Sequence, residues 1–165
     1  MKLHTLVALV LVAPLLLLSA TESRSSGGSD NASSSGSSGS SKYDKYYKKG
    51  KDAQKRKKYE EAVKHYQRAL KAKPKDPDAL NNLGFSLRSI GKQYMAEAAK
   101  AYDAALRADG SHEEALEYQG ELYLWMGELS KANANLRKLE KMNSDEAAEL
   151  REEIEAILAQ AKKLM

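Results

Sequence analysis

The chain has 165 residues, of which 30% are charged and 42% are hydrophobic, and its formal net charge is +4. This length gives room for one domain and accessory segments. The chain contains no cysteine, which excludes a disulfide framework and a thiolate metal site but does not identify the compartment.

The first 20 residues have the features of a secretory signal peptide. Lys2 supplies a positive start, residues 6–18 form an apolar core, and small residues suit cleavage after Ala20 or Ser23. The apolar core is too short for a membrane span, and a proline interrupts it. We therefore predict export to a periplasm, the extracellular space or an organelle lumen, with an uncleaved amino-terminal anchor as the alternative.

Residues 21–41 are dominated by serine and glycine and contain no apolar residue larger than alanine. Such a segment cannot bury enough surface to offset the entropy that it would lose on ordering, so we predict a disordered, flexible linker. Ser41 and the acidic Asp44 fit a capping box, which predicts that the first helix begins there.

Repeated helix pairs are predicted for the central part of the chain. In residues 76–108, apolar residues at three- and four-residue steps indicate two helices joined by a short turn. Asp76 suits the N-cap of the first of them, and Pro77 suits its first turn. Four sets of positions recur at intervals of 34 and 36 residues: Gly50, Gly84 and Gly120; Ala62, Ala98 and Ala132; Tyr66, Tyr102 and Leu136; Ala69, Ala105 and Leu139. This period indicates a solenoid, with small residues where helices approach closely.

These residues resemble the tetratricopeptide repeat (TPR). The sequences ALNNLGFSL and KAYDAAL in the middle repeat are similar to the first and second helices of that family, as is KKYEEAVKHYQRALKAKP in the repeat before it. The resemblance covers residues 42–144 as three repeats, about 43–76, 77–112 and 113–144. It implies an all-α, right-handed α-solenoid of three helix-turn-helix pairs. Lys57 departs from the pattern, because glycine stands at the corresponding turns, Gly91 and Gly127.

Residues 145–165 are predicted to form a seventh helix. Its apolar stripe comprises Ala147, Leu150, Ile154, Ile157, Leu158 and Ala161, and glutamates line the remaining surface. A solenoid needs a terminal element with one polar face to cover its last apolar surface, so we predict a C-terminal capping helix. A dimerisation helix is the alternative.

The residues that could carry catalysis do not form a constellation. His4, His65 and His112 are far apart, and none has a partner at a metal-ligand spacing. No glycine-rich phosphate loop follows a strand, since no strand is predicted. We therefore predict a protein that is not an enzyme and has no cofactor and no metal site.

Charge is distributed unevenly along the repeats. Residues 42–75 have a net charge of +10, residues 76–112 of −1, and residues 113–165 of −5. Solvated helix faces are the simplest interpretation. The basic end could instead meet an anionic surface, or copies could stack basic end on acidic end. Export argues against nucleic acid as a partner, and membrane contact is expected only through an uncleaved signal or the basic first repeat.

The resemblance also implies a binding surface, because in this family the first helix of each pair lines a concave groove that holds a peptide. The matching positions are Tyr47, Lys51, Gln54, Lys55, Asn81, Phe85, Arg88, Ser89, Glu117, Glu121, Leu124 and Trp125. They lie off the predicted apolar packing face. Phe85 and Trp125 are the only Phe and Trp of the chain and could anchor a partner, and Asn81 could bond a peptide backbone. The alternative for Trp125 is packing between repeats.

Family members that bind chaperone tails hold a terminal carboxylate, and the residues for that are not matched here. The corresponding positions are Tyr47, Lys51, Asn82, Glu114 and Tyr118, of which only Asn82 agrees, and Glu114 would repel a carboxylate. Lys51 and Arg88, set against Glu117 and Glu121, instead predict a ligand of mixed charge, acidic toward one end and basic toward the other. The expected function is a non-catalytic protein-interaction scaffold, with a self-assembling structural protein as the alternative.

Overall fold

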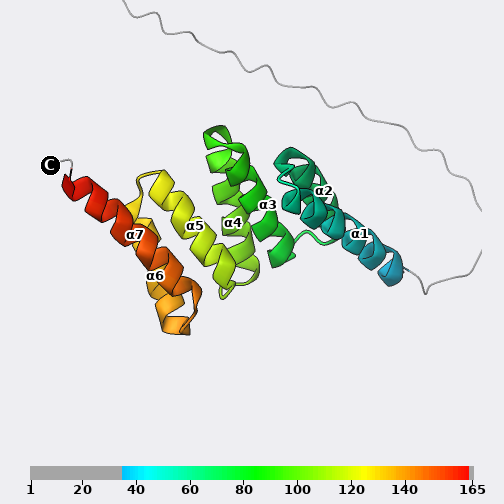
Figure 1. The fold of residues 1–165 in the computed structure, drawn as a ribbon. Coiled ribbons are helices and arrows are strands. Elements are labelled where there is room, and N and C mark those ends of the chain that lie inside the picture. The colour runs from blue at the N-terminus through cyan, green and yellow to red at the C-terminus, as the bar shows by residue number, and fades with distance from the viewer. Residues whose placement is uncertain (1–34, 164–165) are drawn as a thin grey trace, which may run out of the picture. The chain divides into compact units, whose positions relative to one another are not determined.

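The computed structural model describes residues 35–163, which belong to one compact unit. Within that range it contains helices and no strand (Figure 1). In chain order they are α1 (Ser35–Lys55), α2 (Tyr59–Ala72), α3 (Pro77–Ile90), the short 3-10 helix η1 (Lys92–Tyr94), α4 (Met95–Ala108), α5 (Glu113–Trp125), α6 (Leu129–Met142) and α7 (Glu146–Lys163). The predicted signal peptide, residues 1–20, and residues 21–34 of the predicted linker lie outside the described residues.

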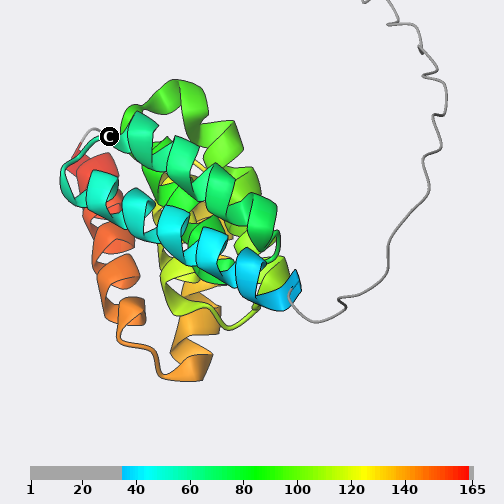
Figure 2. The same cartoon turned by 90° about the vertical axis from the view of Figure 1, so that its right-hand side faces the viewer.

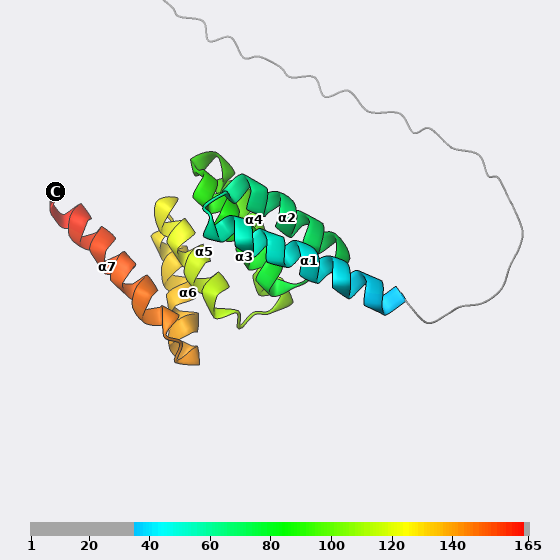
Figure 3. The same cartoon turned by 45° about the vertical axis from the view of Figure 1, so that its right-hand side comes forward.

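The helices form three antiparallel pairs, α1 with α2, α3 with α4 and α5 with α6, followed by α7 (Figure 2). The backbone of each odd-numbered helix approaches that of the next odd-numbered one, whereas within the described residues the backbones of α2 and α4, and of α4 and α6, do not come close to each other. The odd-numbered helices therefore line the inner side of the row (Figure 3). The predicted right-handed α-solenoid of three pairs and a capping helix is confirmed.

The recurring small residues are places where helices touch. A Cβ atom on Gly50 would lie 2.6 Å from the ring of Tyr66, and one on Gly84 would lie 2.8 Å from the ring of Tyr102. A Cβ atom on Gly120 would likewise lie 2.5 Å from the side chain of Leu150 in α7. These distances are shorter than van der Waals contact, so a larger residue would force the helices apart. The interpretation of the small residues as sites of close approach is confirmed.

The start of α1 differs from the prediction. The helix begins at Ser35 rather than at Ser41, and Ser41 lies within it instead of capping it. The hydroxyl of Ser40 donates to the Asp44 carboxylate at 3.3 Å, a bond along the helix surface. A helix that has nucleated extends at little further cost, because each added residue brings one more hydrogen bond. The packing of Tyr43 and the residues after it thus supports a helix that continues into the serine-rich segment.

Three of the helices end with the same left-handed turn. Lys57 has a φ of 56° and Asn143 one of 53°, and Gly127 has a φ of 76°. After α1, the N–H of Lys58 donates to the carbonyl of Ala53 at 2.9 Å, closing the hydrogen-bonded loop that typically ends a helix. The equivalent bonds join residues 128 and 123 at 2.7 Å, and residues 144 and 139 at 3.1 Å.

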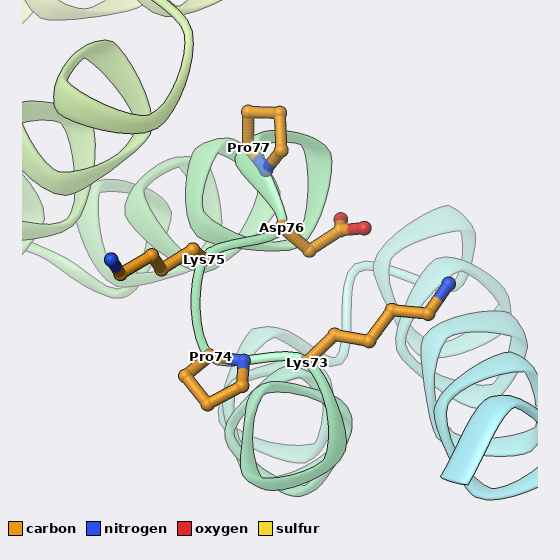
Figure 4. A pocket seen from close by; sticks show the side chains of 5 residues that line it. All are labelled: Lys73, Pro74, Lys75, Asp76 and Pro77. Carbon is orange, nitrogen blue, oxygen red and sulfur yellow. The ribbon is translucent and has the colours of Figure 1, made fainter. Parts of the chain in front are cut away.

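The connection between the first two repeats is closed by Asp76. Its carboxylate accepts from the N–H of Ala79 at 3.0 Å, which confirms the predicted N-cap, and from the Tyr43 hydroxyl at 2.6 Å. The ammonium of Lys73 lies 4.0 Å from the centre of the Tyr43 ring. Figure 4 shows Lys73 and Asp76 extending toward α1 and Lys75 pointing the other way, around a cavity of about 490 Å³. None of the predicted groove residues lines this cavity.

The third repeat begins with a histidine cap. His112 is the N-cap of α5, and its Nδ1 accepts from the N–H of Ala115 at 3.3 Å. At the other end of the row, α7 packs on α5 and α6 through Ala147, Leu150 and Ile154. Ile157 and Leu158, which belong to the predicted apolar stripe, are 40% and 41% exposed. No described helix is long and apolar enough to cross a membrane.

Candidate functional site

A basic cavity of about 360 Å³ lies on the inner side of the first two repeats. It is lined by Lys51, Gln54, Lys55, Lys57, Tyr59, Asn82 and Phe85. Within residues 35–163, none of its three lysines forms a salt bridge. Arg56 and Lys58 in the same turn instead pair with Glu61, at 3.5 and 4.0 Å. The cavity is therefore lined by cations that the described part of the chain leaves unneutralised.

Aromatic and amide side chains form the wall of the basic cavity. The Phe85 ring is tilted against Tyr118 at 5.4 Å and lies edge-on to Tyr59 at 6.2 Å. The amide of Asn82 donates to the Tyr47 hydroxyl at 3.2 Å and to the Asp78 carbonyl at 2.8 Å. Both hydrogens of that amide are thus already engaged within the fold.

The side that α1, α3, α5 and α7 line is called the inner surface here, and Arg88 lies at its centre. It is only 7% exposed and forms an ion pair with Glu121 of the next inner helix. Its guanidinium lies 5.6 Å from the ring centre of Phe85, 5.3 Å from that of Tyr118 and 4.9 Å from that of Trp125. Cation–ring contacts of this kind are strengthened by burial. Trp125 itself is 54% exposed, so the indole contacts Arg88 yet remains available to a partner.

An acidic cavity of about 530 Å³ lies between α5 and α7, lined by Glu121, Glu149, Glu152, Glu153 and Ala156. The sequence interpretation treated the α7 glutamates as a solvated face and missed this wall. A signal was present, since Glu149 and Glu153 recur at a four-residue step and so share one face of the helix. The cap helix therefore also contributes to the inner surface.

Glu117 is buried beneath this acidic wall, with 5% of its surface exposed. Burial, which is the largest cause, and the neighbouring carboxylates of Glu149 and Glu146 together raise the pKa of its carboxyl to about 7. The positive charge of Arg88 lowers the pKa of the Glu117 carboxyl. Near neutral pH this carboxyl is thus close to its titration midpoint.

The predicted groove residues divide into three groups. Lys51, Gln54, Lys55 and Phe85 line the basic cavity, and Arg88, Glu121 and Trp125 come together beside it. The remaining predicted positions are committed to packing or lie apart from both cavities: Tyr47, Asn81, Ser89, Glu117 and Leu124.

Three of these, Leu124, Asn81 and Glu117, are buried and so differ from the expectation that they lie off the packing face. Leu124 is 7% exposed and packs in the core with α6 and α7, because the C-terminal turn of α5 is covered by those helices. Asn81 is 6% exposed, and its buried Oδ1 has no hydrogen-bond partner among the described residues. Tyr47 is half-buried and stacks on Tyr43 at 5.3 Å.

The described residues contain no group of three or more His, Asp or Glu side chains that could hold a metal ion. At the positions that correspond to a terminal-carboxylate site, the Glu114 carboxylate contacts the His112 ring at 3.3 Å. The inner surface presents charged and aromatic side chains.

Residues 44–91 match the family model described as the TPR repeat. No curated protein sequence matches the chain. Solved TPR structures match it in fold. The first TPR of Spaghetti (RPAP3), bound to the HSP90 peptide SRMEEVD, is 24% identical with a TM-score of 0.64, covering 73% of this chain and 95% of that one.

Two further structures come from yeast and from a bacterium. The TPR2B domain of yeast Sti1, in a complex with pHsp70, is 20% identical with a TM-score of 0.66, covering 73% of this chain and 98% of that one. The type III secretion translocator chaperone SycD of Yersinia enterocolitica is 20% identical with a TM-score of 0.65, covering 76% and 88%. Residues 35–163 thus have the fold of a TPR domain, and the first part of that fold also carries the sequence pattern of the TPR repeat.

Proposed function

We propose that this protein is a non-catalytic interaction scaffold that binds an extended segment of a protein partner along its inner surface. The observation that carries the proposal is the pair of oppositely charged cavities on neighbouring inner helices, with the exposed indole of Trp125 beside them. Indole rings that are partly exposed often dominate the binding free energy of an interface. Electrostatic complementarity would set the direction in which the segment lies.

The partner segment is proposed to carry mixed charge. Its acidic part would lie over α1 and α3, where the three unpaired lysines are, and its basic part over α5 and α7, where Glu149, Glu152 and Glu153 are. The RPAP3 domain is bound to the HSP90 peptide SRMEEVD, and the Sti1 domain is in a complex with pHsp70. A chaperone tail is not proposed here, because Asn82 has its amide hydrogens engaged and Glu114 stands where a cation would be needed.

Affinity capture from the exported fraction of the source organism tests this proposal. The full chain serves as bait beside its Trp125→Ala variant, and Tyr94→Ala serves as the control, because Tyr94 is another exposed aromatic residue but lies on η1. A protein retained by the parent and by Tyr94→Ala but lost by Trp125→Ala supports recognition by the inner surface. Equal recovery by all three baits contradicts it.

Self-assembly is the second candidate, and the exposed side chains of Ile157 and Leu158 favour it. They leave apolar surface at the acidic end of the row, which could pack on the basic end of another copy as a head-to-tail contact. Sedimentation over a range of protein concentrations tests this. Assembly through charged ends predicts a mass that rises with concentration and falls in high salt, since surface charge pairs are screened. A constant monomer mass contradicts it.

A further inference from the structure

Lys57 occupies a backbone conformation that disfavours lysine. It has the same left-handed φ and the same closing hydrogen bonds as Gly127 and Asn143, which end two other helices. Glycine and asparagine are the usual residues at this position, since a Cβ atom meets the backbone when φ is positive. The first repeat thus has a lysine where glycine would be more stable.

Nothing in the described part of the chain compensates for this strain. The Lys57 side chain forms no hydrogen bond or ion pair within residues 35–163, whereas Arg56 and Lys58 on either side both pair with Glu61. Its side chain is exposed and lines the basic cavity together with Lys51 and Lys55. A strained residue that contributes nothing to the fold points to a role in binding.

The chemistry of this cavity defines what it can accept. Three unpaired ammonium groups surround a hollow of about 360 Å³, within a segment whose net charge is +10. Phe85 and Tyr59 add an apolar wall to it. A small anionic group next to a large apolar one would satisfy both features, because the cations gain a partner and the rings are covered.

We propose that Lys51, Lys55 and Lys57 form a subsite for carboxylate side chains of an acidic segment, in which acidic residues flank a large apolar residue. This proposal rests on the proposed scaffold function and names the chemistry at one end of the bound segment. The turn lysine, at the end of α1, supplies the third cation of the subsite. Side-chain carboxylates within a segment are recognised here, and a free C-terminus is not required.

A blocked peptide tests the subsite directly. The probe is the acetylated and amidated peptide EELEE, which has no terminal carboxylate, and the equivalent QQLQQ peptide is the uncharged control. Each is titrated into the ¹⁵N-labelled full chain while amide chemical shifts are recorded. We expect EELEE to shift the amides of residues 51–59 and of Phe85, and QQLQQ to leave them unchanged. Shifts spread equally over every lysine-rich surface would overturn the proposal.

The Lys57→Gly variant separates binding from folding, because the two should change in opposite directions. Loss of one cation is expected to weaken the Kd for EELEE about fivefold, and release of the strained turn is expected to raise Tm by about 2–5 °C. Arg56→Ala removes the same charge from a side chain that pairs with Glu61, so it should leave the Kd within about twofold of the parent value. An unchanged Kd for Lys57→Gly, or an equal loss in both variants, would overturn the proposal.

Two results distinguish this subsite from the scaffold function itself. If Trp125→Ala loses a captured partner while EELEE fails to bind the parent, the inner surface is a binding site and the lysine subsite is wrong. If EELEE binds in a Lys57-dependent way while Trp125→Ala captures the same proteins as the parent, the subsite stands and the extended groove is wrong. Binding of heparin with no dependence on Lys57, together with loss of EELEE selectivity over QQLQQ, would indicate nonspecific attraction of polyanions and overturn the subsite.

Discussion

Arg88 of α3 forms an ion pair with Glu121 of α5, and the same guanidinium lies over the Trp125 ring at 4.9 Å. This one side chain therefore joins two neighbouring repeats and also supports the most exposed aromatic residue of the inner surface. Because Arg88 is buried, its charge is held in place rather than free to follow a ligand. The inner surface between the two cavities is thus pre-formed, which lowers the conformational entropy that its own side chains would lose when a partner binds.

The Arg88→Lys variant tests this arrangement. Lysine keeps the positive charge but lacks the planar guanidinium that lies over three rings, so we expect the free energy of unfolding to fall by about 1–2 kcal/mol. Arg107→Lys is the matched control, because Arg107 is exposed on α4. Chemical denaturation measures both. Equal stability of Arg88→Lys and the parent would show that the ring contacts contribute nothing.

The raised pKa of Glu117 predicts a dependence of stability on pH. Its folded-state pKa is about 7, above the ordinary value of 4.5, so the folded state holds the proton more tightly than the unfolded state. The free energy of unfolding should therefore fall as pH rises from about 4.5 to 7, by roughly 2 kcal/mol, and then level off. Glu149 and Glu146 of α7 and Arg88 of α3 are the charged groups that face it.

The comparison of Glu117→Gln with the parent isolates this effect. Glutamine cannot ionise, so denaturation at pH 5 and at pH 8 should show a smaller loss of stability for the variant. Glu155→Gln, an exposed glutamate of α7, is the control and should follow the parent. If parent and Glu117→Gln lose the same stability between the two pH values, the assigned titration is wrong.

The close contact of Gly84 with Tyr102 predicts a large cost for a single methyl group. The Cβ of Gly84→Ala would lie 2.8 Å from a ring that is fully buried and cannot move aside, so stability should fall by about 2 kcal/mol despite the better helix propensity of alanine. At Gly110 the nearest atom is 3.7 Å away, so Gly110→Ala should be nearly neutral. Thermal unfolding of the two variants measures the difference, and similar Tm values would contradict the packing described here.

The fold could be predicted from the sequence because its period repeats a physical contact. Gly50 accommodates the ring of Tyr66, 16 residues further along, and Gly84 accommodates that of Tyr102, 18 residues further along. The spacing of these residues alone therefore indicates which helices touch. The N-cap at Asp76 was also predictable, because aspartate is favoured at the N-cap and proline is favoured at the first helical position that follows it. The start of α1 was not, because serine and glycine disfavour a helix and the extension to Ser35 depends on the packed part of the helix that follows.

The candidate site could be predicted only in part. Family spacing placed Lys51, Phe85 and Trp125 on the inner surface, but it could not tell which side chains the neighbouring helices cover. Leu124 is covered by α6 and α7, and the acidic wall depends on how α7 docks. Both are properties of the packing between helices, which the period of a single helix does not contain.

Export remains a proposal that the sequence supports through residues 1–20. Expression in the source organism, followed by N-terminal sequencing of the exported fraction, should give a mature chain that begins at Thr21 or at Arg24. Replacing the apolar core residue Leu15 with arginine should retain the chain inside the cell, because the core would no longer be recognised. A chain found only inside the cell with Met1 intact would contradict export.

The most direct test of mixed-charge recognition is selection from a displayed library of random peptides on the immobilised full chain. Mixed-charge recognition predicts enrichment of peptides with acidic residues toward one end and basic residues toward the other. This enrichment should be lost on Trp125→Ala and retained on Tyr94→Ala. No enrichment over bare support, or the same enriched sequences on Trp125→Ala, would contradict recognition by the inner surface.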